Sequence, residues 1–116
     1  MNRPCEFEKL TKTFFDAIFP ALQFKAKSCG YALLVHGSLK TDIDLVAVPW
    51  REGAISQESL AEKLRETTES IIGTAEIRRG DDKPTVKPSG RLAWSFWLVP
   101  IGCRGPYIDL SIFPPK

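Results

Sequence analysis

Apolar residues recur at helical spacing through the first quarter of the chain. Over residues 6–29 they fall every three or four positions, which predicts an amphipathic helix. These positions are Phe7, Leu10, Phe14, Ile18 and Leu22. Phe15 and Phe19 widen the stripe that would be buried, whereas Pro20 lacks a backbone N–H and predicts a kink or a break. Gly30 then marks the end of the helical segment.

Two strand-like segments follow, with a short turn between them. Tyr31–Val35 is a run of apolar residues, and Asp42–Pro49 becomes apolar from Leu45 onward. Because the connection between the two segments is short, we expect them to pair as antiparallel neighbours.

The middle of the chain predicts a second helix over Ile55–Ile72. Ser56 or Ser59 would cap its N-terminus, and Gly73 would close it. The expected inner face of this helix consists of Leu60, Leu64, Thr68 and Ile71.

Three more strand-like segments complete the chain. They are Thr74–Arg78, Arg91–Val99 and Tyr107–Phe113. Between the first two, Gly80–Gly90 has the turn residues and charges of an exposed loop. In the last segment Asp109 lies between two apolar residues, so its side chain would point to the face opposite theirs.

This order of elements predicts one α+β domain over residues 1–116. We expect a mixed or antiparallel five-stranded sheet with helices packed on one face. A chain of 116 residues can bury one core but not a catalytic domain plus a separate substrate-binding domain. A substrate would therefore be held by loops, by a second copy of the chain or by a partner protein.

Asp42 and Asp44 place two negative charges at the start of an apolar strand. Side chains at i and i+2 lie on one face, about 7 Å apart along the backbone, so both carboxylates can converge on one cation or a close pair. The simpler alternative is a turn residue followed by a solvated charge at the strand end. Asp109 can join the pair if the last strand lies beside residues 42–49. Such a set of oxygen ligands suits magnesium or manganese better than zinc.

The segment Gly37–Leu45, with its Gly-Ser turn and Asp-x-Asp pair, resembles the DNA polymerase β-like nucleotidyltransferase superfamily. In that superfamily a third carboxylate comes from a later strand, where this chain has Asp109. The resemblance extends from about Tyr31 to Phe113 and is closest to small single-domain forms of phage and prophage type. Only three residues separate Ser38 from Asp42, fewer than in many members.

The resemblance implies a nucleotidyltransferase-like fold and specific roles for the residues of this segment. Asp42, Asp44 and Asp109 would hold Mg²⁺ or Mn²⁺ and take part in catalysis. The residues expected to contact the nucleoside triphosphate are Gly37, Ser38 and Lys40. A turn rich in Gly and Ser, or a lysine within it, is often only a solvated connection.

Several other polar and aromatic residues are weaker candidates. The basic residues Lys83, Lys87 and Arg91 flank the expected loop and would reach a nucleotide or an anionic acceptor only if the loop folds over the site. Asp81 and Asp82 are adjacent in an exposed loop, so they are expected to point apart. We assign no catalytic role to the single histidine, His36. Among Trp50, Trp94 and Trp97, only Trp97 is considered for a ligand or partner surface.

Charge and cysteine content exclude some classes of protein. With 16 basic and 14 acidic residues, the net charge of +2 gives no strong field for non-specific nucleic-acid binding, which weighs against a dedicated DNA-binding protein. Cys5, Cys29 and Cys103 form no metal-binding or disulfide pattern and are expected to be reduced thiols. The N-terminus lacks the apolar core of a signal peptide, and no apolar run is long enough to cross a membrane, so we expect a cytoplasmic protein.

We therefore expect a minimal nucleotidyltransferase that moves a nucleoside monophosphate from a metal-bound nucleoside triphosphate to an unknown acceptor hydroxyl. The alternative from another class is a catalytically inactive nucleotidyltransferase-fold module that binds a protein or nucleic-acid partner. The short connection before Asp42 favours the alternative, whereas the complete carboxylate set favours the enzyme. A metal-dependent phosphohydrolase or nuclease would use similar carboxylates but explains the Gly-Ser turn less well.

Overall fold

The computed structural model describes residues 4–75, 83–99 and 105–116, and gives side chains from residue 8 onward. Within these residues the helices are α1 (Pro4–Ser28) and α2 (Gln57–Ile72). The strands are β1 (Tyr31–His36), β2 (Asp42–Pro49), β3 (Thr85–Val86), β4 (Leu92–Trp97) and β5 (Tyr107–Ile112). A short 3₁₀ turn, η1 (Pro88–Gly90), lies between β3 and β4.

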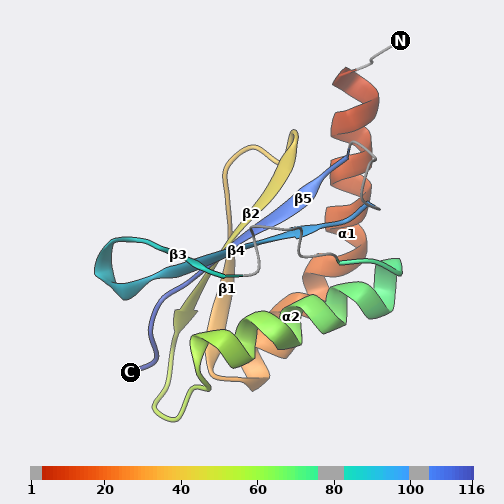
Figure 1. Cartoon of the computed structure of the whole chain (residues 1–116). Helices are drawn as coiled ribbons and strands as arrows, with labels where there is room; N and C mark the ends of the chain where they lie inside the picture. The colour runs from red at the N-terminus through yellow and green to blue at the C-terminus, as the bar shows by residue number, and fades with distance from the viewer. Residues whose placement is uncertain (1–3, 76–82, 100–104) are drawn as a thin grey trace.

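The strands form a single sheet in the order β1-β2-β5-β4-β3. β2 and β5 run parallel, and the other neighbouring pairs run antiparallel. Both helices pack on one side of this sheet and against each other (Figure 1). The predicted α+β class is therefore confirmed, with a mixed five-stranded sheet and the predicted antiparallel pairing of the first two strands.

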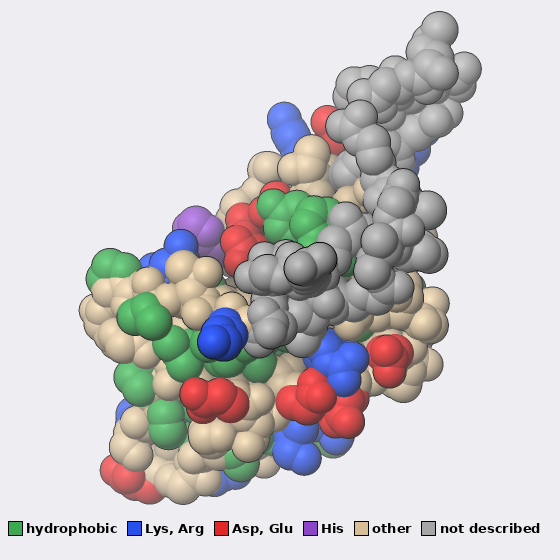
Figure 2. Space-filling view, in the orientation of Figure 1, with side chains coloured by type: hydrophobic (Ala, Val, Ile, Leu, Met, Phe, Trp, Pro, Cys, Tyr) green, Lys and Arg blue, Asp and Glu red, His purple; other side chains and the backbone are tan. Residues whose placement is uncertain are grey.

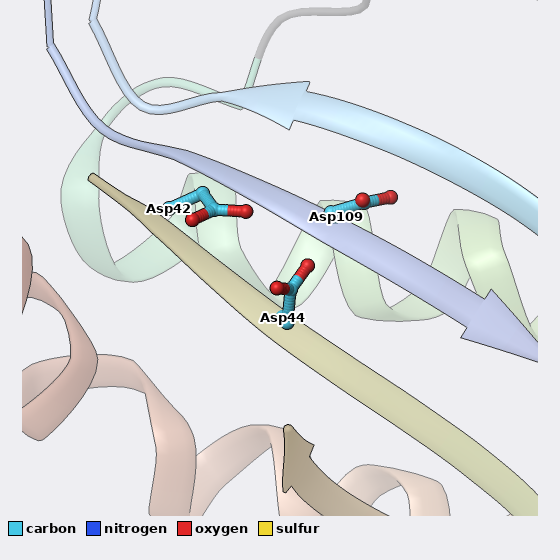
Figure 3. A group of neighbouring side chains, drawn as sticks. All are labelled: Asp42, Asp44 and Asp109. Atoms are coloured by element: carbon cyan, nitrogen blue, oxygen red, sulfur yellow. The ribbon is translucent and has the colours of Figure 1, made fainter. Parts of the chain in front are cut away.

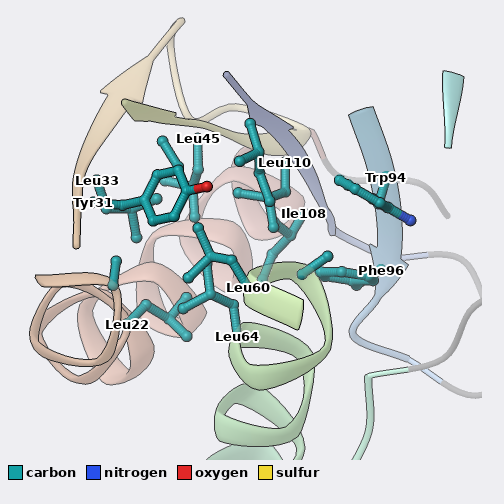
Figure 4. Packing of buried hydrophobic residues seen from close by; sticks show 14 of the residues in the cluster. Leu22, Tyr31, Leu33, Leu45, Leu60, Leu64, Trp94, Phe96, Ile108 and Leu110 are labelled. Atoms are coloured by element: carbon teal, nitrogen blue, oxygen red, sulfur yellow. The ribbon is translucent and has the colours of Figure 1, made fainter. Parts of the chain in front are cut away.

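The core lies between the sheet and the two helices (Figure 4). Side chains alternate between the two faces of a strand, so every second residue of β2 and β5 enters this layer. The strand residues buried there include Ile43, Leu45, Ala47, Ile108, Leu110 and Ile112. The helices contribute Ile18, Leu22, Ala26, Leu60, Ala61 and Leu64. The intervening residues of the same strands therefore point to the face that the helices leave open.

Helix α1 continues through Pro20. The sequence predicted a kink or a break at this residue, and the break is therefore wrong. Proline removes one hydrogen bond of the helix ladder, but the buried residues Ile18 and Leu22 on either side hold both halves against the core. The predicted stripe is also wrong at Leu10, which is 40% exposed, whereas the adjacent Thr11 is buried. The covered side of this part of α1 thus includes Thr11 rather than Leu10, although the N-terminal part of the helix extends past the sheet (Figure 1).

Helix α2 has the predicted caps at both ends. The Ser56 hydroxyl accepts a hydrogen bond from the Ser59 backbone N–H at 3.1 Å. Gly73 is left-handed, with φ of 96°, and its N–H donates to the Glu69 carbonyl at 2.8 Å. The inner face is buried at Leu60, Leu64 and Thr68 as predicted, with Ala61 in addition. Ile71 is 43% exposed, so its predicted place on the inner face is wrong.

The outermost strand β3 differs most from the prediction. Thr74 and Ala75, the described part of the predicted strand 74–78, are not in a strand, and residues 76–78 lie outside the described residues. Thr85 and Val86, within the predicted loop, instead pair with Ala93 and Leu92 of β4. A strand of two residues is too short to show alternation in the sequence.

The cysteine and membrane predictions are tested in part. Cys29 is a buried free thiol, whereas the Cys5 side chain and Cys103 lie outside the described residues. Within the described chain, neither helix has the length and hydropathy needed to cross a membrane.

Candidate metal centre

Three carboxylates meet on the open face of the sheet, where β2 and β5 run side by side. The register places Asp44 of β2 directly beside Asp109 of β5. Asp42 lies two residues before Asp44 on the same strand and therefore on the same face. One carboxylate oxygen from each residue lies within 4.8 Å of the other two. In Figure 3 the Asp44 carboxylate lies between those of Asp42 and Asp109. The predicted juxtaposition is confirmed.

The carboxyl separation fits a divalent cation. Magnesium binds oxygen ligands at about 2.1 Å in an octahedron, so its protein ligands lie about 3–4 Å from one another. The spacing of up to 4.8 Å requires the side chains to move inward by less than about 1 Å, or to bridge a close pair of cations. All three residues are only partly buried, so a cation could enter from solvent. Mg²⁺ or Mn²⁺ thus matches this set of ligands.

The proximity of the acidic groups perturbs the pKa of Asp44. This pKa is raised from its ordinary value of 3.8 to about 6, first by burial, then by the charges of Asp42 and Asp109, and then by hydrogen bonds with the same two residues. A carboxyl group whose pKa is raised in this way lacks a compensating positive charge. A divalent cation would supply that charge and favour the ionised form.

The pKa of Asp109 is also raised, first by burial and second by the charge of Asp42. Its hydrogen bond with Asp44 and the positive charge of Lys87 act in the opposite direction. The interaction between the two carboxyl groups thus raises the pKa of Asp44 and lowers that of Asp109. Lys87 is therefore close enough to Asp109 to influence its charge.

An aromatic pair lies beside the carboxylates on the same face. Tyr107 is in register with Asp42 on one side and with Trp97 on the other. The ring centroids of Trp97 and Tyr107 lie 4.4 Å apart. Burial, followed by the charges of the three aspartates, raises the pKa of the Tyr107 hydroxyl. Trp97 thus lies on the face for which we considered it, whereas Trp94 is buried in the core and Trp50 is 49% exposed.

Gly37 supports the site by leaving room for a carboxylate. Its φ is +87°, and a Cβ at this position would lie 3.0 Å from Oδ2 of Asp44. Any other residue would strain the backbone and press against that oxygen. The glycine is therefore required both by the turn and by the position of the Asp44 carboxylate. A Gly37 substitution would affect both of them.

The other two predicted nucleotide ligands stand apart from the carboxylates. Ser38 and Lys40 are exposed on the turn between β1 and β2. Neither is among the described residues lining the cavity beside Asp44 and Asp109. Their contact with a nucleotide stays a prediction.

A cavity of about 260 Å³ opens beside the carboxylates on the helix-free face. Its described lining includes Asp44, Asp109, His36, Lys87, Arg91 and Ser111. Figure 2 shows acidic side chains beside the histidine, with a basic side chain nearby. Lys87 and Arg91 were weak candidates in the sequence analysis. The sequence did not indicate that β3 pairs with β4, and this pairing places the two residues beside the cavity. Lys83 is exposed and is not part of the described lining. Asp81 and Asp82 lie outside the described residues.

Ser111 is a lining residue that the sequence analysis did not select. It lies two residues after Asp109 on β5, so alternation alone places it on the carboxylate face. That signal was available once Asp109 was identified as a site residue.

Comparison with known proteins adds no family assignment. No protein-family model matches the chain, and no curated protein matches its sequence. The functional assignment therefore depends on the geometry of the site.

Proposed function

We propose that this chain is a metal-dependent nucleotidyltransferase that uses Mg²⁺ or Mn²⁺ held by Asp42, Asp44 and Asp109. The observation that carries the proposal is the convergence of three carboxylates from two parallel strands within 4.8 Å, on a solvent-accessible face. The Gly-Ser turn beside them adds the resemblance to the DNA polymerase β-like superfamily. We also propose that the chain belongs to that superfamily.

In nucleotidyl transfer, the oxygen of an acceptor hydroxyl bonds to the α-phosphorus of a nucleoside triphosphate. The bond from that phosphorus to the oxygen bridging to the β-phosphate breaks, and pyrophosphate leaves with the electron pair. When bound, a divalent cation supplies charge neutralisation for the triphosphate. The hydroxyl proton must pass to a base, and we assign this role to Asp109, the carboxylate that the second strand contributes to the site.

The proposal is tested by titrating a nucleoside triphosphate into the protein in the presence of Mn²⁺, with calorimetric detection. Wild-type protein should bind, and the variant Asp42→Asn/Asp44→Asn should not. Asp109→Asn should retain the far-UV circular dichroism of the wild type, because the change is nearly isosteric, but should lose transfer of an α-phosphate label. If wild-type protein binds no nucleoside triphosphate with either cation, the enzyme proposal is wrong.

A second candidate is an interaction module, and one observation favours it. Exposed apolar side chains line a groove of about 470 Å³ between α1 and the edge strand β1. Phe24 is 75% exposed, Leu34 53% and Trp50 49%. Contiguous exposed apolar residues of this kind mark protein interfaces, and an edge strand offers unpaired backbone groups.

The interaction module is tested first with the protein as its own partner. If copies associate through the groove, Phe24→Ser should lower the mass measured by light scattering at high concentration. Val86→Ser is the matched control, because Val86 is 76% exposed on β3, away from the groove. A wild-type protein that stays monomeric would exclude self-association and leave a different protein as the partner.

A cytoplasmic location is consistent with both candidates. Nucleoside triphosphates and magnesium are present there, and a reducing compartment suits the buried free thiol of Cys29.

A further inference from the structure

The cavity beside the candidate metal centre is lined by both acidic and basic side chains. Asp44 and Asp109 are the carboxylates of its described lining, and Lys87 and Arg91 line the same cavity. A ligand that carries both a cation and an anionic group would match this lining.

Two polar atoms in this lining are buried and have no hydrogen-bond partner among the described residues. They are Nε of Arg91 and Oγ of Ser111. An unpaired buried donor costs free energy comparable to a lost hydrogen bond. Both groups can donate to an anion, and both lie on the walls of the same cavity as the carboxylates. Their unsatisfied state points to a bound acceptor.

The basic residues are held in place by a closed turn. The Lys87 backbone N–H donates to the Arg91 carbonyl at 2.8 Å, which closes the turn around η1. The side-chain amide of Gln57, at the start of α2, donates to the carbonyls of Gly90 and Ile112 at 2.9 and 2.7 Å. The Arg91 guanidinium carbon lies 5.7 Å from the centroid of the Phe113 ring. The turn is thus fixed to both α2 and β5.

We propose that Lys87, Arg91 and Ser111 form the phosphate subsite for the triphosphate of a metal-bound nucleotide. This inference rests on the proposed nucleotidyltransferase function. Phosphate oxygens accept charge-assisted hydrogen bonds from lysine and arginine, and the cation held by the aspartates offsets their repulsion of the phosphates. The subsite lies on β5 and on the connection between β3 and β4, and is distinct from the Gly37–Lys40 turn to which the resemblance assigns the phosphates.

The cavity volume limits which part of the nucleotide this subsite takes. Pockets that enclose a drug-sized ligand measure about 300–1,000 Å³, whereas this cavity measures about 260 Å³. Its small volume and polar lining favour the phosphates over the base as the part of the nucleotide held there.

Calorimetric titration with the preformed complex of Mn²⁺ and inorganic tripolyphosphate tests this subsite without a nucleoside. Wild-type protein should bind the complex, and Lys87→Gln and Arg91→Gln should each weaken the affinity about tenfold or more. Lys83→Gln is the matched control, because Lys83 is an exposed lysine on the same segment outside the described lining. Its affinity should equal that of the wild type.

Equal affinity in Lys87→Gln, Lys83→Gln and the wild type would overturn the subsite. Lys87 is exposed, so this variant tests the proposal even if Arg91→Gln is poorly folded. A separate measurement of the melting temperature with Mn²⁺ alone distinguishes the two proposals. A metal-dependent shift without tripolyphosphate binding would refute the subsite alone. If tripolyphosphate binds in a Lys87-dependent way but Mn²⁺ does not change the melting temperature, the proposed metal-dependent enzyme is wrong and only the anion-binding site is supported.

Discussion

Replacing Asp44 with asparagine should stabilise the metal-free protein at neutral pH. In the folded state burial and the neighbouring carboxylates raise the Asp44 pKa from 3.8 to about 6. Above pH 6 the protein must therefore carry an unfavourable charge that the unfolded chain carries at no cost. Asparagine keeps the shape and removes the charge.

The size of this effect follows from the pKa shift. A change from 3.8 to about 6 corresponds to about 3 kcal/mol at full effect. Solvent reaches the carboxylate and screens its interactions, so we expect about 1 kcal/mol. For a chain of this length that raises the melting temperature of Asp44→Asn by about 4 °C at pH 7.5 in the presence of a chelator.

The dependence of the effect on pH has a defined sign. The folded-state pKa of Asp44 is raised, so its contribution to stability is greatest below pH 3.8 and is lost as the pH rises to about 6. The advantage of Asp44→Asn should therefore be present at pH 7.5 and absent near pH 3.5. Differential scanning fluorimetry at both pH values measures it.

The control is Asp16→Asn, the same chemical change at an exposed site. The Asp16 carboxylate lies 2.6 Å from the Lys12 ammonium group, so its loss should lower stability by about 0.3–0.5 kcal/mol. Addition of Mg²⁺ at ten times its dissociation constant should stabilise wild-type protein by about 1.4 kcal/mol and leave Asp44→Asn unchanged. If Asp44→Asn melts below the wild type at pH 7.5 without metal, the carboxylates do not repel one another as argued.

Three further changes test the supports of the site and the fold. Gly37→Ala should lower the free energy of unfolding by about 1–2 kcal/mol because the backbone φ at this position is positive. It should also weaken Mn²⁺ binding, because the new methyl group would lie against Asp44. An unchanged Mn²⁺ affinity would show that the glycine serves only the turn. Ser56→Ala should cost about 1 kcal/mol in urea denaturation by removing the α2 cap, whereas the exposed Ser70→Ala should change little. Leu64→Ala should cost about 2–5 kcal/mol from the buried core, and a loss below 1 kcal/mol would contradict the packing described.

The elements with strong periodicity could be predicted from the sequence. Residues 42–49 form a strand with the predicted bounds, and α2 has the predicted capping residues. Leu10 and Ile71 are 40% and 43% exposed, although the adjacent Thr11 is buried and the adjacent Ile72 packs against the core. Spacing gives the apolar side of a helix, but the neighbouring elements decide which residues at the margin of that side are covered.

The sequence also identified the carboxylates, but only conditionally. Asp42 and Asp44 share a face through local geometry, whereas Asp109 is more than sixty residues away along the chain. Its position depends on β5 pairing with β2 rather than with β1, and no local pattern encodes that choice. Long-range pairing is decided by packing of the whole core.

Parallel pairing of β2 with β5 is the step that turns three separate aspartates into one site. Parallel neighbours start from the same end of a sheet, so Asp42, Asp44 and Asp109 all lie within the first three residues of their strands. All three carboxylates lie on the face that the helices leave open, and each is only partly buried. The sheet thus concentrates negative charge where a cation can enter, and the raised pKa of Asp44 reflects the unfavourable proximity of these charges without one.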